Sequence, residues 1–151
     1  MLRQQLNDAL KAAMKAQDKR RVSTLRLILA ALKDRDIAAR SGDNGDGISE
    51  SDILGMLQTM IRQRRDSIEQ FKQGGRKDLA DKEAEEIAVI QDFLPAQLDE
   101  GEVGEACRQV VAELEAGGLK DMGRVMGELK SRYTGRMDFA KASAAVKELL
   151  S

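Results

Sequence analysis

The stretch that decides the fold class is Val22-Ser23-Thr24-Leu25-Arg26-Leu27-Ile28-Leu29-Ala30-Ala31-Leu32. Apolar residues recur in it every three or four positions, which is the spacing of one face of an α-helix. They are Val22, Leu25, Ile28, Leu29 and Leu32, with Ile37 further on. The pattern predicts a helix over residues 18–40, with Asp18 as its N-cap.

On either side of this stretch, the same periodicity predicts helices over residues 2–16, 49–73 and 76–93. Ser49 and Asp52 have the spacing of a capping box. Residues 41–47 are rich in glycine and acidic residues and predict a loop; their acidic spacing does not fit a calcium-binding loop. We therefore expect an N-terminal helical domain of about four helices over residues 1–94.

The segment that follows the fourth helix marks a domain boundary at Pro95, the only proline. Asp99 and Glu102 form a second capping-box pattern, and Gly117-Gly118 is expected to stop that helix. Two further short helices follow, with Asp121 and Asp138 as N-caps and Gly135 between them as a C-cap. The fold class is therefore all-α, with a small three-helix C-terminal domain over residues 95–151.

The residue inventory excludes several classes of chemistry. The chain has 151 residues, of which 42% are hydrophobic and 34% charged, as in a folded protein. It has no histidine and one cysteine, Cys107, which excludes Ser-His-Asp and Cys-His mechanisms, zinc sites and an intramolecular disulfide. We expect no catalysis by this chain alone, no cofactor and no metal, and we expect Cys107 to be an inert core residue.

The first residues lack the apolar run of a secretory signal peptide, and no stretch approaches the roughly 20 apolar residues that cross a bilayer. These observations predict a cytosolic protein without a membrane partner. The net charge of −1 argues against strong non-specific binding to polyanions.

Local clusters of charge are present nonetheless. One basic cluster opens the second helix at Lys19, Arg20, Arg21 and Arg26, and another lies at Arg62, Arg64 and Arg65. Either could bind phosphate, but helix-surface pairs four residues apart, such as Arg62–Asp66 and Arg65–Glu69, are the favoured interpretation. The acidic segment 82–86 is interpreted as a solubilising face.

The C-terminal domain separates its charges along the chain. Residues 99–116 contain six acids and one base, a net charge of −5, whereas residues 120–148 contain seven bases and four acids, a net charge of +3. This asymmetry could direct a polyanion to the last two helices. The candidate nucleic-acid contacts are Lys120, Arg124, Lys130, Arg132 and Arg136.

Gly123 and Gly127 lie four residues apart on one face of the middle helix of this domain. Each glycine costs the helix up to about 1 kcal/mol relative to alanine. Close approach of an RNA or protein backbone would offset that cost, but tight packing against neighbouring helices is the favoured interpretation.

Several motifs in order resemble the GatB/YqeY family, in its free-standing YqeY-like form, over nearly the whole chain. They are Ser23-Thr24-Leu25-Arg26-Leu27, the segment 62–71, the segment 78–86, Phe93-Leu94-Pro95, the segment 121–126 and Gly135-Arg136-Met137-Asp138. Met137 and Phe139 depart from the family pattern, which usually has small residues at these positions; for Phe139 we expect a core position.

The resemblance implies a C-terminal domain similar to the tail of the B subunit of the tRNA-dependent amidotransferase. If function follows it, the five basic residues would contact tRNA, and Gly123 and Gly135 would shape that surface. The family label is a carbon–nitrogen ligase with glutamine as amido-N-donor, but the ATP-binding and ammonia-generating parts are absent from this chain.

Three hypotheses follow. The leading one is a tRNA-binding or aminoacyl-tRNA-binding accessory protein. The alternatives are a protein-interaction adaptor and a component of a glutamine-dependent amidotransferase that acts only with other subunits.

Overall fold

The structure is a computed structural model that describes residues 1–40 and 47–151. The loop predicted over residues 41–47 falls almost wholly outside these described residues. Over the described residues the chain is helical throughout, with no strand, which confirms the all-α prediction. It divides into two compact units, Met1–Leu94 and Pro95–Ser151. That these units are separate domains stays a prediction.

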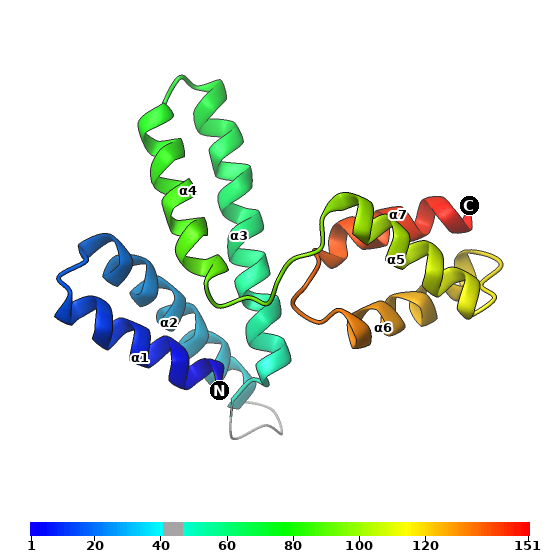
Figure 1. Cartoon of the computed structure of the whole chain (residues 1–151), viewed down its shortest axis with the longest axis horizontal. Helices are drawn as coiled ribbons and strands as arrows, with labels where there is room; N and C mark the ends of the chain where they lie inside the picture. The colour runs from blue at the N-terminus through cyan, green and yellow to red at the C-terminus, as the bar shows by residue number, and fades with distance from the viewer. Residues whose placement is uncertain (41–46) are drawn as a thin grey trace. The chain divides into compact units, whose positions relative to one another are not determined.

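The first unit contains four helices. They are α1 (Leu2–Lys15), α2 (Lys19–Arg40), α3 (Glu50–Gln73) and α4 (Lys77–Gln91). Figure 1 shows α1 beside α2 and α3 beside α4, as two hairpins, and α4 also packs on α2. The core contains Leu6, Leu25, Ile28, Leu57 and Ile90, none of them exposed to solvent. The stripe that predicted α2 is therefore the face that builds this core, except that Ile37 is 53% exposed.

Local signals position the helix ends in this unit. Ser49 and Asp52 form the predicted capping box at the start of α3. Asp18 caps α2 by accepting a hydrogen bond from the Arg21 N–H, at 3.2 Å. Gln17, between α1 and α2, has a positive φ of 56°, although glycine is the residue that usually occupies this left-handed conformation.

A group of hydrogen bonds joins α1 and α2 to the segment just before α3. The Arg3 guanidinium donates to both carboxylate oxygens of Asp36 and to the Ile48 carbonyl, the last at 2.8 Å. The Ile48 N–H donates to the same Asp36 carboxylate at 3.0 Å. These bonds hold the pKa of Asp36 at about 2, below its ordinary value of 3.8, chiefly because the Arg3 guanidinium stabilises the ionised form.

The second unit contains α5 (Glu100–Glu113), a short 3-10 helix (Leu119–Asp121), α6 (Met122–Arg132) and α7 (Phe139–Leu150). All three α-helices contact one another. Their shared core includes Cys107, Val110, Val125, Leu129 and Val146, all fully buried. This confirms the core position predicted for Cys107, and burial raises the pKa of its thiol. Phe139 is half-buried against the same core.

Asp99 and Glu102 form the predicted capping box of α5, and the Asp138 carboxylate accepts from the Ala140 N–H at 2.9 Å to cap α7. The predicted stop of α5 at Gly117-Gly118 was wrong. The helix ends earlier, at Glu113, and Glu115 adopts a left-handed φ of 52°. The chain can therefore leave a helix through a non-glycine residue when the hydrogen bonds of the turn hold it there.

The segment before α5 is held against the turn that joins α6 to α7. The Leu98 N–H donates to the Arg136 carbonyl at 2.8 Å, and the Gln97 amide donates to the Gly135 carbonyl at 2.6 Å. Gly135 is buried with φ of 76°, so the turn needs a residue without a Cβ. It lies two residues beyond Tyr133, which is the C-cap of α6.

Candidate functional site

Helix α6 carries most of the residues predicted to contact a nucleic acid. Val125 and Leu129 are fully buried and fix which face of α6 points to the core. Gly123 and Gly127 lie about 120° to 160° around the helix from these residues, on the solvent side, by the 100° turn per residue of an α-helix. Both glycines are exposed.

The two glycines have no packing role within the described chain. A Cβ atom built on either would meet no other atom within 4 Å. The favoured interpretation from sequence, close packing against a neighbouring helix, was therefore wrong. The exposed face of α6 is instead flat and free of side chains at two positions four residues apart, which leaves room for the backbone of another molecule.

Two lysines border this flat face. Lys130 lies three residues after Gly127, and Lys120 lies three residues before Gly123, in the short 3-10 helix. Both are exposed. Among the described residues, neither ammonium group makes a hydrogen bond or ion pair, so their charge is available to an anionic ligand.

Arg124 lies beside the same face but also has a structural contact. Its guanidinium donates to the Leu114 carbonyl at the end of α5, at 2.9 Å, and to the Asp121 carboxylate at 3.3 Å. Its side chain is still 53% exposed. Arg124 thus ties α5 to the start of α6 while part of its guanidinium still faces solvent.

Asp121 occupies the predicted N-cap position of α6 but does not cap the helix with its side chain. Its side chain makes no capping hydrogen bond to α6 and accepts instead from the Gly117 N–H at 2.9 Å. This bond, followed by the nearby charges of Arg124 and Lys120, lowers the pKa of Asp121. The carboxylate therefore holds the connection between α5 and α6.

Arg132 lies on another side of α6, toward α5. It donates to Glu113 of α5 at 2.6 Å and to Glu128 of α6 at 2.8 Å. These bonds raise the pKa of Arg132. The bond from Arg132 is also the largest of the effects that lower the pKa of Glu113. Two carboxylates surround this one cation, so Arg132 contributes no positive field to the exposed face.

Arg136 lies in the turn after α6, where its Nε donates to the Ala96 carbonyl at 3.1 Å. Gly135, next to it, accepts the bond from Gln97 described above. The structure thus brings together Lys120, Gly123, Arg124, Gly127 and Lys130. We call these five residues the α6 face; Arg132, Gly135 and Arg136 lie outside it.

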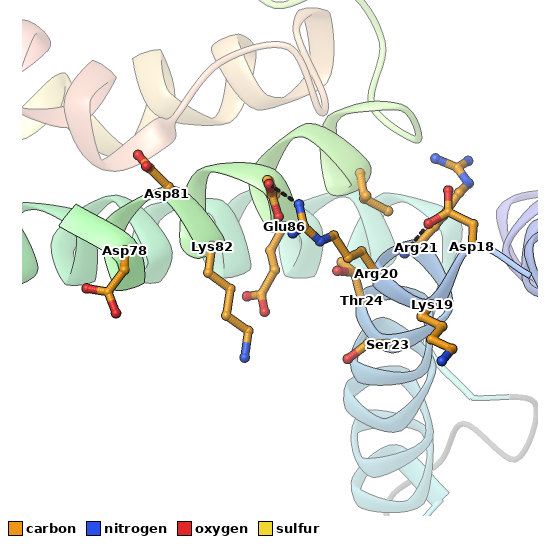
Figure 2. Close-up of a pocket in the computed structure, with 12 residues that line it drawn as sticks. Asp18, Lys19, Arg20, Arg21, Ser23, Thr24, Asp78, Asp81, Lys82 and Glu86 are labelled. Carbon is orange, nitrogen blue, oxygen red and sulfur yellow. Dashed lines mark hydrogen bonds and ion pairs between the residues drawn. The ribbon is translucent and has the colours of Figure 1, made fainter. Parts of the chain in front are cut away.

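Two arginines of the basic cluster at the start of α2 are bound to acidic residues of α4 and its C-cap. Arg20 pairs with Glu85, and Arg21 pairs with Asp92 at 2.8 Å while its guanidinium lies 5.9 Å from the Phe93 ring centroid. Figure 2 shows residues at the start of α2 and on α4 that line a groove in this region. The groove has a volume of about 740 Å³. Its lining carries charges of both signs, so it does not concentrate positive charge.

Arg64 makes the same kind of contact between α3 and α4. Its Nε donates to Glu86 at 2.9 Å, and its side chain and that of Glu86 are only 14% and 15% exposed. The interpretation of segment 82–86 as a solubilising face was therefore wrong for Glu86, which is half-buried. The predicted pair of Arg65 and Glu69 does not form in the described chain. The neighbouring Arg64 is instead bonded across to α4.

Sequence reasoning missed one surface, on α1 and α2. Met14 and Leu27 are large apolar residues that remain 51% and 45% exposed. Leu27 could have been noticed because it lies outside the stripe of Leu25, Ile28 and Leu32.

The described residues contain neither a metal-binding cluster nor a membrane-spanning helix. No group of three or more histidine, cysteine, aspartate or glutamate residues is arranged to hold a metal ion. No helix of the described chain has the length and apolarity needed to cross a membrane.

Comparison with known proteins gives consistent relatives. The family model described as Yqey-like protein matches residues 3–150. Proteins named "Altered inheritance of mitochondria protein 41, mitochondrial" are similar to this chain. The one from Lachancea thermotolerans is 36% identical over 59% of this chain and 46% of its own length. The one from Pyrenophora tritici-repentis is 28% identical over 93% of this chain and 76% of its own length. The chain spans about half the length of the first of these relatives.

These names overturn the prediction of a cytosolic protein, because the relatives are named as mitochondrial. That prediction rested on the lack of a secretory signal pattern and of an apolar span, and a protein of the mitochondrial interior lacks both as well. Since the family model covers nearly every residue, the chain belongs to the family of YqeY-like proteins.

Proposed function

We propose that this chain is an RNA-binding accessory protein that contacts tRNA through the α6 face. The observation that carries the proposal is the exposed pair Gly123 and Gly127, which serves no packing purpose within the described chain and lies between two unpaired lysines. Because the two glycines carry no side chains, a sugar–phosphate backbone can approach this helix face closely, and the bordering cations attract its phosphates.

The charges around the face support a phosphate ligand. Lys120, Arg124 and Lys130 provide the cations, and the Asp121 carboxylate beside them accepts hydrogen bonds from the Gly117 N–H and Arg124. Affinity is expected to be modest, because three cations release few counterions and the whole chain has a net charge of −1. The proposal assigns no catalytic step to this chain.

The test is a titration of the full chain into fluorescently labelled tRNA at two salt concentrations. We expect the logarithm of the affinity to fall with the logarithm of the salt concentration, with a slope of up to about 0.9 per phosphate contact. Replacing Lys130→Gln should weaken binding and reduce that slope by roughly 1. The charge reversal Lys120→Glu should weaken binding further.

Lys77→Glu is the matched control, because Lys77 is an exposed lysine at the start of α4 in the other unit. It changes the net charge by the same amount as Lys120→Glu. Equal loss of affinity in the two variants would show that only net charge matters and would contradict the proposed face. Absence of binding at low salt would remove the RNA function altogether.

A further inference from the structure

A groove of about 790 Å³ lies on the hairpin of α1 and α2, in the unit that the proposed function does not use. Its apolar lining consists of Met14 near the end of α1 and of Val22 and Leu27 on α2. Met14 and Leu27 are about half exposed, as is Ile37 near the other end of α2, whereas Leu6, Leu25 and Ile28 of these helices are buried. Clustered exposed apolar residues in a concave site are typical of a binding groove.

Two cations line the groove, Lys19 and Arg26, and no carboxylate does. Within the described chain, neither cation makes a hydrogen bond or ion pair. Their neighbours Arg20 and Arg21, which point to α4, are both paired with acidic residues. The groove therefore combines an apolar floor with positive charge that the chain itself does not neutralise.

The turn between the helices fixes the shape of the groove. The Gln17 N–H donates to the Met14 carbonyl at 3.2 Å, and the Asp18 N–H donates to the Ala13 carbonyl at 3.0 Å. This is the hydrogen-bond pattern that ends a helix in a Schellman motif. These bonds fix the backbone of the turn at Gln17, which lines the groove, and a fixed backbone reduces the entropy cost of binding.

We propose that this groove binds an amphipathic helix of a partner protein, whose apolar side chains are flanked by aspartate or glutamate. The apolar side chains would contact Met14, Val22 and Leu27, and the carboxylates would pair with Lys19 and Arg26. Methionine suits such a site because its flexible thioether adapts to the partner's side chains.

Other occupants fit the groove less well. A lipid surface is engaged by apolar side chains that protrude from a protein, whereas this site is concave and receives side chains. The acidic helix α5 of a second copy does not match either, because its apolar residues Ala106, Cys107 and Val110 are buried in its own core.

The probe is a fluorescein-labelled helical peptide with leucines at positions i, i+4 and i+7 and glutamates on both flanks, and fluorescence anisotropy measures its binding to the full chain. We expect Leu27→Asp and Arg26→Glu each to weaken binding by roughly tenfold or more. Leu149→Asp is the control, since Leu149 is an exposed leucine of α7. Circular dichroism verifies that each variant keeps its helical signal.

A charge-exchange experiment distinguishes a specific ion pair between Arg26 and the peptide from a general disruption of the groove. The Arg26→Glu variant should bind a lysine-flanked version of the peptide better than the original chain does. Failure of this exchange, or equal binding by the Leu27→Asp variant, would overturn the proposal. So would absence of peptide binding up to about 1 mM.

Two further outcomes would assign the groove to another occupant and overturn the proposal. One is binding to phosphatidylglycerol vesicles that Leu27→Asp abolishes while the peptide does not bind. The other is a dimer, seen by sedimentation, that Leu27→Asp dissociates.

Discussion

Arg64 on α3 and Glu86 on α4 form a half-buried ion pair, with 2.9 Å between Nε and Oε2. Arg64 also donates to the Met60 carbonyl at 3.2 Å and lies 4.0 Å from the Glu83 carboxylate, so its guanidinium has partners on two helices. The two side chains lie 22 positions apart in the sequence, and the pair therefore fixes how one helix of the hairpin lies against the other.

Removing one partner of this pair should destabilise the protein. Arg64→Met leaves the Glu86 carboxylate without its cation in a mostly desolvated place, and we expect a loss of about 1–3 kcal/mol in the free energy of unfolding. The double variant Arg64→Met with Glu86→Leu should recover part of the loss, because only the more exposed carboxylate of Glu83 then lacks the Arg64 cation. Urea unfolding measures both. Arg108→Met, which breaks the exposed pair with Glu105, is the control and should change stability little.

Asp36 should give the protein an acid-sensitive contribution to stability. Its pKa is about 2 in the folded chain and 3.8 ordinarily, so the unfolded chain binds more protons between these values. Stability from the Asp36–Arg3 pair is therefore fully present above about pH 4 and is lost as the pH falls through 2. Asp36→Asn should lower stability at neutral pH and flatten the pH dependence between pH 4 and 2, measured by thermal unfolding. An unchanged slope would contradict the role of this carboxylate.

Gln17 and Glu115 adopt left-handed conformations after α1 and α5, with φ of 56° and 52°. Glycine adopts this conformation without steric cost, so Gln17→Gly and Glu115→Gly should each raise the free energy of unfolding by about 0.5–1 kcal/mol. The control is Ala16→Gly at the adjacent right-handed position, where glycine should destabilise. If Gln17→Gly destabilised as much as the control, the turn would not have the geometry described.

Substitutions at Gly123 and Gly127 should affect the stability of the protein and its affinity for tRNA in different ways. Because a Cβ meets nothing at either position, alanine there should stabilise α6 by up to about 1 kcal/mol per site. Bulky Gly127→Leu would also fit the free chain but would hold an RNA backbone away from α6. We expect tRNA affinity to fall while thermal stability is kept. Gly55→Leu on α3, another exposed helical glycine with open space, is the control for affinity. Unchanged tRNA binding by Gly127→Leu would contradict the proposed face.

Sequence reasoning succeeded where the determining interactions are local. The capping boxes Ser49–Asp52 and Asp99–Glu102 connect residues three apart, and both were predicted. The apolar stripe of α2 was predicted because burial of one helix face leaves a regular spacing. The family assignment, made from motifs along the chain, was confirmed over residues 3–150.

Sequence reasoning failed where contacts between residues far apart in the sequence determine a residue's environment. Glu86 belongs to an acidic run that looks solvated, and only the packing of α3 on α4 brings Arg64 to it. For Gly123 and Gly127, packing was favoured over binding from the sequence, and only their surroundings in the structure showed otherwise. Gln17 and Glu115 gave no signal because left-handed residues are recognised from glycine, which neither of them is. The binding roles of the five basic residues stay predictions.

The bonds that join Leu98 and Gln97 to the turn after α6 have a practical consequence for dissecting this protein. The segment that looks like a linker is part of the second unit, since its backbone and side chain complete the turn around Gly135. A fragment designed to carry α5, α6 and α7 alone has to begin at Pro95. One that begins at Asp99, where the helix signal starts, would leave two carbonyl groups of that turn without their donors.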